Sequence, residues 1–495
     1  MKRFTLLVCM CMIAAPTYAA DDPQTRGGKL LEQHHYNEAI VLLRSAIVTL
    51  DPAKEGVAFL SAGVAYLRNA ELHRELSRAA LTTGADYLKK LAADTGPGRS
   101  RMAGLFLGEL LLEAGNLDAA AASLEKFAAN EAMDKEHREI ARVLLGSVAF
   151  RSGNAAKADE VWASVDRSDA EVRTELGLAF SRAGLTDRGP VTLIDEAIAA
   201  FRREGKKLPA RVQKNALAVY LQAGLVDRAM EIVRGADLKA PLEREHVGPS
   251  KDINFYSASL HQDLAHLYLK AALAVLEKAS KDGRTKDIAN FHRSEVHALL
   301  GETGQARTAL TDFIANDRIP HQFRSRAKAR LAAIEYQEGR QDEGKAAWDA
   351  LIKKNPNDPA LLEETLLACG RLGADCPRAA RQAGAVAAEG QGRKLAPLQA
   401  ALGRYLLGKG KSAQGRALAA LEAARDKGNK NKIEPNDPAL LVDLADLYYR
   451  TKKFSEALEI YFEMGKQFPE VRSIQEPLQG IYSMEQKSAG DARIN

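Results

Sequence analysis

Histidines are the side chains of this sequence best suited to holding a metal ion. His261 and His266 are five residues apart, as are His292 and His297. Five residues turn an α-helix by about 140°, so neither pair shares one face as residues four apart would. A metal site in which the two segments face each other is the alternative to ordinary polar histidines. We expect no metal ion.

Common catalytic and nucleotide-binding motifs are absent from the sequence. It has no His-Glu-x-x-His, Gly-x-Ser-x-Gly or Cys-x-x-Cys. Gly410-Lys411-Ser412 is similar to the end of a phosphate-binding loop. Such a loop needs another glycine five residues before Gly410, and Tyr405 occupies that position. Carboxylates are scattered over predicted turns and helix starts, so no acid–base pair can be assigned. We therefore expect no catalytic residue, no cofactor and no enzymatic activity; an activity lost on mutating the four histidines would support the enzyme alternative.

The first 20 residues have the three-part layout of a secretory signal. Met1–Arg3 is positive, Phe4–Ala15 is apolar, and small residues follow, so that cleavage after Ala19 or Ala20 fits. Two cysteines within the apolar run lack the preceding residues of a lipid-anchor signal. An uncleaved anchor is the alternative, but the run is short. The sequence predicts an exported, periplasmic protein that is not a lipoprotein and has no membrane span after signal removal.

Two further cysteines, Cys369 and Cys376, lie close together in the sequence. The residues between them are typical of a helix end, a turn and the start of the next helix. In an oxidising compartment, a disulfide between them would staple one helical hairpin. The alternative is that Cys369 is a free thiol packed as a small apolar side chain.

Composition and charge exclude several classes of protein. The chain has 495 residues and a net charge of +5, and removal of Lys2 and Arg3 with the signal lowers it to +3. That charge is too weak to indicate a nucleic-acid partner. Hydrophobic residues make up 46% and charged residues 27%, as in folded proteins. Few aromatic residues and abundant alanine favour closely packed helices over a β-sandwich or barrel.

A pattern of paired amphipathic helices recurs along the chain. Its clearest copy is Pro438–Pro469, in which two apolar stripes at helical spacing flank the polar turn Arg450–Lys453. Ala445 and Ala457 are small residues that let two antiparallel helices approach closely.

One heptapeptide, Pro-Asn-Asp-Pro-Ala-Leu-Leu, occurs twice, at 356–362 and at 435–441. Each copy precedes an apolar helical stripe. Asp358 and Asp437 are in the right place for an N-cap, with proline at the first helical position. The sequence therefore predicts that a helix begins at each copy.

This hairpin pattern resembles the tetratricopeptide repeat, with large, Leu, small and Tyr positions in helix A, then Ala, an aromatic residue and a terminal Pro. The resemblance covers residues 27 to 483 in about ten hairpins. It implies an all-α fold, a right-handed superhelical solenoid of tandem helix-turn-helix units. Residues 63–91 and 260–279 are helical in pattern, but their spacing is overlong or irregular. The alternative is an unrelated all-α protein with accidental glycine and alanine spacing.

Breaks in the pattern suggest the domain organisation. Residues 238–254 form the longest irregular stretch and predict a linker. The linker would separate an N-terminal solenoid half, 21–237, from a C-terminal half, 255–485. Residues 486–495 predict a flexible tail.

The resemblance implies that A helices line an inner groove that holds a peptide or a helix of a partner. Its register places the following residues there: Arg151, Arg182, Lys214, Asn215, Tyr336, Arg404, Tyr449 and Arg450. Glu109, Glu113 and Asp446 oppose the basic side chains. Lys214-Asn215 is similar to the Lys and Asn that grip peptide backbones in some family members, although the rest of that clamp is missing. The alternative is that the arginines are solvated near helix C-termini and the tyrosines pack on exposed helices.

The family resemblance implies a non-enzymatic scaffold that binds protein partners of the cell envelope, in assembly, secretion or surface-polymer export. The alternative is a polysaccharide-associated export factor whose basic groove contacts an acidic polymer or its modifying enzymes, because arginine forks onto carboxylates. Binding of a polymer should weaken steeply with salt, and binding of a peptide with apolar anchors should weaken less. The sequence leaves the oligomeric state open.

Overall fold

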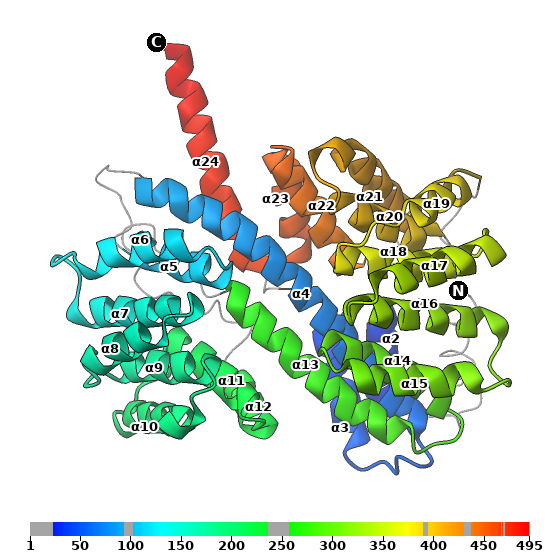
Figure 1. Ribbon diagram of the computed structural model, residues 1–495, viewed down its shortest axis with the longest axis horizontal. Helices are drawn as coiled ribbons and strands as arrows, with labels where there is room; N and C mark the ends of the chain where they lie inside the picture. The colour runs from blue at the N-terminus through cyan, green and yellow to red at the C-terminus, as the bar shows by residue number, and fades with distance from the viewer. Residues whose placement is uncertain are drawn as a thin grey trace. The chain divides into compact units, whose positions relative to one another are not determined.

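A computed structural model describes residues 23–93, 102–235, 257–389, 395–429, 437–466, 468 and 471–494 (Figure 1). Throughout these ranges the regular elements are α-helices and short 3₁₀ helices, without a β-strand. The predicted all-α fold is confirmed. Chain contacts define two compact units: unit 1 comprises Met1–Leu72 and Tyr268–Lys453, and unit 2 comprises His73–Leu267 and Phe454–Asn495.

Unit 1 contains most of the helices of the C-terminal part of the sequence. Its complete helices are α2 (Pro23–Glu32), α3 (Tyr36–Ile47), α14 (Lys286–Leu299), α15 (Thr303–Ala315), α16 (His321–Gln337), α17 (Gln341–Lys354), α18 (Pro359–Leu372), α19 (Pro377–Glu389), α20 (Ala396–Leu407), η3 (Lys411–Ala413), α21 (Gln414–Asn429) and α22 (Pro438–Arg450). Two long helices, α4 (Gly56–Ala93) and α13 (Ser257–Ala279), contribute residues to both units.

Unit 2 is built mainly from the residues between these two long helices. Its complete helices are α5 (Ala103–Glu113), α6 (Leu117–Ala128), α7 (Lys135–Arg151), α8 (Ala155–Ser164), α9 (Ala170–Arg182), η1 (Thr186–Arg188), α10 (Pro190–Arg203), α11 (Ala210–Gln222), α12 (Val226–Gly235), α23 (Phe454–Met464) and α24 (Arg472–Ile494).

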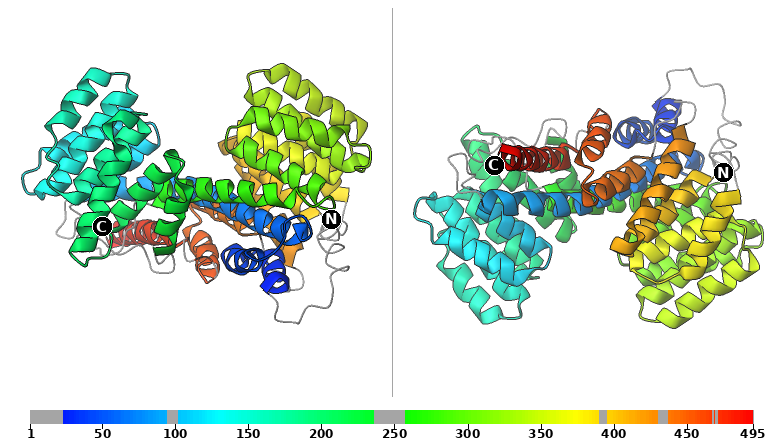
Figure 2. Two further views of the ribbon diagram at one scale, coloured as in Figure 1. Left: turned by 90° about the horizontal axis from the view of Figure 1, so that it is seen from below. Right: turned by 90° about the horizontal axis from the view of Figure 1, so that it is seen from above.

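Glycines on the first helix of a hairpin, helix A, let the second helix, helix B, pack closely against it. A Cβ atom on Gly108 would lie 2.5 Å from Leu124 Cγ, and one on Gly146 would lie 2.3 Å from Trp162 Nε1. Successive A helices also pack against each other, in the order α5, α7, α9, α11 in unit 2 and α14, α16, α18, α20, α22 in unit 1. Figure 2 shows the hairpins of each unit stacked side by side. The arrangement is the tandem, tetratricopeptide-like solenoid that the sequence predicts.

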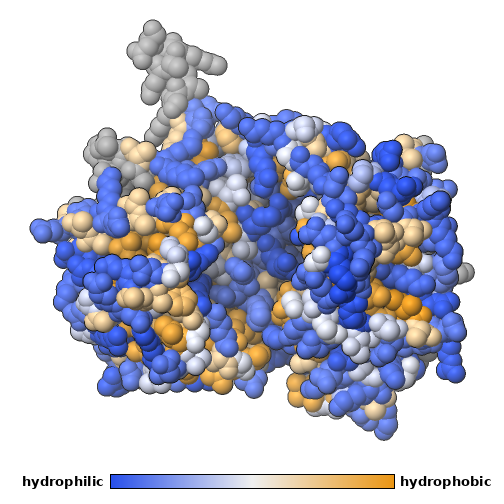
Figure 3. Space-filling model, viewed as in Figure 1, coloured by the Kyte–Doolittle hydropathy of each residue, from blue (hydrophilic) through white to orange (hydrophobic). Residues whose placement is uncertain are grey.

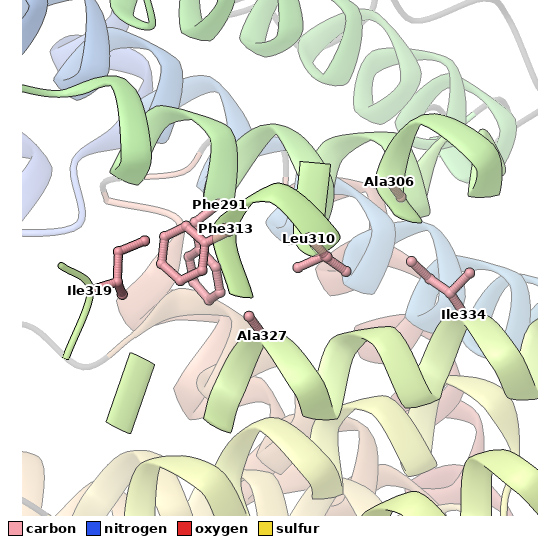
Figure 4. Close-up of a cluster of buried hydrophobic side chains, with 7 residues drawn as sticks. All are labelled: Phe291, Ala306, Leu310, Phe313, Ile319, Ala327 and Ile334. Carbon is pink, nitrogen blue, oxygen red and sulfur yellow. The ribbon is translucent and has the colours of Figure 1, made fainter. Parts of the chain in front are cut away.

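The apolar faces of neighbouring hairpins form a continuous core, as α14, α15 and α16 illustrate (Figure 4). Phe291 of α14 and Phe313 of α15 lie with ring centroids 5.1 Å apart. Ala327 of α16 is buried beside them and is small enough to let that helix approach. Because each hairpin buries its apolar face only by stacking on the next, the repeats stabilise one another.

One hairpin of unit 1 is assembled from segments far apart in the sequence. A Cβ atom on Gly63 of α4 would lie 2.6 Å from Leu276 Cγ of α13, the same close contact that joins the two helices of an ordinary hairpin. Residues 63–91 and 260–279 therefore lack regular repeat spacing because each belongs to a single long helix. The division into units falls within α4 and α13 and does not follow the predicted halves; the predicted linker 238–254 lies outside the described residues.

Local signals set several helix ends. The carboxylate of Asp358 accepts hydrogen bonds from the backbone N–H groups of Ala360 and Leu361, and that of Asp437 accepts one from Ala439. Both predicted N-caps are confirmed. The structure joins Cys369 and Cys376 by a disulfide that links the end of α18 to the start of α19.

The two ends of the chain differ in what can be described. The predicted cleavage positions Ala19 and Ala20 lie outside the described residues. Residues 486–494, which the sequence assigns to a flexible tail, continue the helix α24 in the structure. No described helix is both long and apolar enough to cross a bilayer. Hydrophilic residues cover most of the face seen in Figure 3, with hydrophobic patches among them.

Candidate functional site

The A helices of unit 2 meet in a buried cluster of charges, the unit 2 cluster. Glu109 of α5 accepts hydrogen bonds from Arg211 Nη2 at 3.1 Å and from Lys214 Nζ, both of α11. Arg211 also donates to Glu175 of α9 at 2.6 Å, and Asn215 donates to the same carboxylate at 3.0 Å. All five side chains are buried. Burial alone would raise the pKa of Glu109, but the charges of Arg211 and Lys214 outweigh it and lower that pKa to about 2.

Two further carboxylates lie within the electrostatic reach of Lys214 of the unit 2 cluster. Glu113, the last residue of α5, and Asp263 of α13 are half-buried carboxylates. Glu113 Oε1, Asp263 Oδ2 and the Oγ atom of buried Ser259 are inaccessible to solvent, and a hydrogen bond from the Ser259 hydroxyl stabilises the ionised carboxylate of Glu113. Burial raises the pKa of Asp263 to about 7, although Arg182 and Lys214 oppose the shift. Burial likewise raises the pKa of Glu113.

A pair of histidines, one on α4 and one on α13, is buried in unit 2. The Nδ1 atoms of His73 and His261 are 2.8 Å apart, so one ring donates its proton and the other accepts. Burial lowers the pKa of His73 well below its usual value, and repulsion from His261 lowers that pKa further. The ring of His73 is therefore neutral. Over the described ranges, no group of three or more His, Cys, Asp or Glu side chains is arranged to hold a metal ion.

The A helices of unit 1 carry a second set of charges, the unit 1 ladder. Arg330 of α16 lies between Glu364 of α18, at 2.6 Å, and Glu295 of α14, at 3.1 Å. Arg326 bonds to the same Glu364 at 3.1 Å. The guanidinium of Arg330 also lies 3.9 Å from the ring centroid of Phe291, a cation–π contact. Each of these ion pairs therefore joins two successive A helices.

The predicted groove residues fall into two groups in the structure. Lys214, Asn215 and Tyr449 are buried, and nearly every residue of the helices that carry them, α11 and α22, is buried too. These three side chains are enclosed by the protein itself, so they do not form an open surface. Arg404 pairs with buried Asp443 of the neighbouring A helix.

The remaining predicted residues are more accessible. Arg182 and Arg151 are exposed, and Arg151 donates to the backbone carbonyl of Leu112. Arg450 is exposed and pairs with Asp446 at 2.9 Å. Tyr336 is half-buried, with its ring 5.8 Å from that of Trp348. Only Arg182 and Lys214 of the predicted set act on the same groups, the carboxylates of Glu113 and Asp263.

Three members of the unit 2 cluster, Arg211, Glu175 and Asp263, are absent from the predicted site. A signal for one of them is present in the sequence. Arg211 and Lys214 are three apart in a helix whose other residues are uncharged and mostly apolar, which places two cations on one buried face. Charges on such a face require carboxylates from neighbouring helices. Which carboxylates pair with these two cations depends on which A helices lie close together in the fold.

Comparisons with known proteins give similarity in structure only. No family model matches the chain, and no curated protein matches its sequence. The yeast Tom70 structure is 14% identical, over 95% of this chain and 96% of that chain, with a TM-score of 0.33. A tetratricopeptide repeat protein from Parabacteroides merdae is 14% identical, over 70% and 98%, with a TM-score of 0.26. The Cut9-Hcn1 structure is 14% identical, over 96% and 98%, with a TM-score of 0.28. The solenoid assignment rests on the hairpins of this chain.

Proposed function

We propose that this chain is a non-enzymatic scaffold that binds a polypeptide segment of a partner protein on the A helices of its solenoid units. The observation that carries the proposal is the partial exposure of charges on successive A helices. In unit 1 the exposed fractions are 11% for Arg330, 17% for Arg326 and 24% for Arg404. Rigid helices hold these side chains in place, so little conformational entropy is lost when a partner binds.

We further propose that the protein acts in the bacterial cell envelope after export. The support is the positive, apolar and small-residue layout of residues 1–20. N-terminal sequencing of the protein purified from a periplasmic fraction tests this point. The expected first residue is Ala20 or Asp21, and a chain that starts at Met1 in the cytoplasm would contradict it.

An acidic polymer receives less support than a polypeptide partner. Three of the basic residues expected to attract such a polymer already pair with carboxylates of the chain: Lys214 with Glu109, Arg404 with Asp443 and Arg450 with Asp446. This pairing lowers the positive potential that a polyanion needs.

In-cell photocrosslinking tests the proposed scaffold. Photoreactive residues are placed at the exposed A-helix positions Arg182 in unit 2 and Arg371 in unit 1. Matched controls are placed at the exposed B-helix positions Lys157 and Lys353. We expect a discrete protein adduct from positions 182 or 371 that the controls do not give. Carbohydrate-bearing smears would favour the polymer, and equal adducts from all four positions would contradict binding on the A helices.

A further inference from the structure

The connection between α10 and α11 concentrates positive charge on the surface of unit 2. Four of the six residues 202–207 are cations, and one carboxylate, Glu204, accompanies them. All six residues are exposed to solvent. We call residues 202–207 the basic turn, and its cations are Arg202, Arg203, Lys206 and Lys207.

The helix dipole accounts for only part of this charge. The two arginines occupy the last turn of α10, where a cation interacts favourably with the dipole. The two lysines lie beyond the end of that helix, after Gly205. Glu204 pairs with Lys206 at 2.7 Å, and neither arginine forms an ion pair with a carboxylate of the described residues. The basic turn therefore retains positive charge that the chain does not neutralise.

The corresponding connections of the neighbouring hairpins carry the opposite charge. Residues 129–134 contain two carboxylates and no cation, and residues 165–169 contain two carboxylates and one arginine. These connections precede α7 and α9, as the basic turn precedes α11, and the three A helices pack in succession. The basic turn is therefore a local positive site on an edge of unit 2 whose other described connections are acidic.

We propose that the basic turn binds a short acidic segment, a run of a few Asp or Glu residues, of a partner polypeptide. Arginine binds a carboxylate through two parallel hydrogen bonds, and the lysines add two point charges. The small extent of the site decides between kinds of polyanion. A long acidic polymer or an anionic membrane surface would extend over the acidic connections and be repelled there, whereas a short segment would not.

This site goes beyond the proposed function, because it lies outside the A helices. Within the described ranges, the large apolar side chains that are exposed are Val41, Val48 and Phe462, and none of them belongs to α10 or α11. Binding at the basic turn therefore depends on charge without an exposed apolar anchor. Such binding weakens as salt screens the charges.

Fluorescence anisotropy with labelled, end-blocked peptides tests the inference on the full chain. The probes are Gly-Glu-Glu-Glu-Glu-Gly and the matched Gly-Gln-Gln-Gln-Gln-Gly, at about 20 mM and about 150 mM salt. We expect the glutamate peptide to bind about tenfold more tightly at the lower salt and to lose most of that preference at the higher salt. Equal affinity for the two peptides, or no binding of the glutamate peptide, would overturn the inference.

Two double variants locate the site. Arg202→Gln with Arg203→Gln should weaken binding of the glutamate peptide about 3- to 10-fold, since each exposed ion pair contributes a few-fold. Lys353→Gln with Lys354→Gln is the matched control, because it removes two exposed cations from the last turn of another B helix, α17. The control should keep the wild-type affinity. Equal weakening in the two double variants would overturn the inference.

Carbodiimide coupling gives a second readout that needs no substitution. The reagent joins a carboxylate of the bound peptide to a nearby lysine amine as an amide, and it takes up the water that is lost. Mass spectrometry should find the glutamate peptide on Lys206 or Lys207 in preference to Lys157 and Lys353, which are exposed on other B helices. Equal coupling to all four lysines would count against a site at the basic turn.

Two further probes compare the other polyanions: polygalacturonate and vesicles that contain phosphatidylglycerol. At equal concentrations of anionic groups, we expect both to bind more weakly than the glutamate peptide. Tighter binding of either one that is lost in the arginine double variant would overturn the inference in favour of a polymer or a membrane. The adducts expected from Arg182 and Arg371 do not depend on the basic turn, so the scaffold proposal and this inference can fail separately.

Discussion

The two units bury charge in different ways. In unit 2, Glu109 holds Arg211 and Lys214, whose side chains are each 1% exposed. In unit 1, Glu364 holds Arg326 and Arg330, which are 17% and 11% exposed. Arg330 also has a second carboxylate, Glu295, at 3.1 Å. Arg211 likewise has a second carboxylate, Glu175, at 2.6 Å, so the two sets of charges differ in how deeply their cations are buried.

This difference separates structural charges from charges that are available to a partner. A fully enclosed ion pair must find all its partners within the chain, because water cannot replace a lost one. A partly exposed pair keeps access to water and can exchange one carboxylate for another. We expect the unit 2 cluster to stabilise the fold and the unit 1 ladder to meet partners.

The largest effect is expected from Glu109→Gln. Enclosed Lys214 loses its counterion and enclosed Arg211 keeps only Glu175, and removal of one partner of a buried pair costs about 3–5 kcal/mol. The matched change in unit 1, Glu364→Gln, should cost about 1–2 kcal/mol, because Arg330 keeps Glu295 and Arg326 reaches water. Urea denaturation gives both values.

Each unit has its own fluorescent reporter for this measurement. The sequence contains two tryptophans, and Trp162 lies in unit 2 and Trp348 in unit 1, both 1% exposed. Trp348→Phe and Trp162→Phe backgrounds therefore report one unit each. Equal losses from Glu109→Gln and Glu364→Gln would refute the distinction between the two sets of charges.

Loss of the disulfide should affect unit 1 alone. Cys369 and Cys376 are seven residues apart, and a cross-link that closes so short a loop contributes about 2–3 kcal/mol. Replacing both cysteines with alanine should lower the urea midpoint seen by Trp348 and leave the transition seen by Trp162 in place. An equal shift of both transitions would show that the units do not unfold separately.

A smaller effect is expected at a hairpin glycine. Gly146→Ala would place a methyl group 2.3 Å from Trp162 Nε1, and overpacking of this kind costs about 1–3 kcal/mol. Gly304→Ala is the control, because a Cβ atom there meets nothing within 4 Å. That change should stabilise α15 in unit 1 by up to about 1 kcal/mol through helix propensity. A destabilising Gly304→Ala would remove the support for this argument.

The sequence is sufficient to predict the hairpins but not the partners of their charges. The spacing of small residues follows from contacts within one hairpin, such as Gly146 with Trp162. The duplicated heptapeptide predicts its helix starts because an N-cap acts over two or three residues. The contact between Gly63 and Leu276 joins residues more than two hundred positions apart in the sequence, and no local sequence pattern predicts it.

The candidate site was predictable only in part for the same reason. Repeat register correctly places Lys214 on an A helix, but it cannot show that Glu109 lies opposite or that α11 is enclosed. Asp263 belongs to a long helix outside the regular repeat spacing, so the repeat register gives it no position. Its place beside Glu113 depends on how α13 packs within unit 2.

The smallest effect concerns the pH dependence of unit 2. Asp263 has its pKa raised to about 7 in the folded chain, above its ordinary value of 3.8, so the folded state retains a proton that the unfolded state has released. Stability should therefore fall as the pH rises from about 4 to about 7 and level off above that range. The contribution of Glu109 to stability depends on pH in the opposite direction. Because its pKa is lowered to about 2, Glu109 stabilises the folded state above pH 4.5, and this stabilisation is lost as the pH falls below that value.

Comparison of Asp263→Asn with the wild type between pH 5 and pH 8 isolates the first contribution. The variant should gain about 1 kcal/mol relative to the wild type over this range, less than the full shift implies because the half-buried side chain is partly hydrated. Asp118→Asn, at an exposed position of α6, controls for loss of a charge. A difference that is constant with pH, or that favours the wild type as the pH rises, would mean that burial does not raise the pKa of Asp263 in the folded chain.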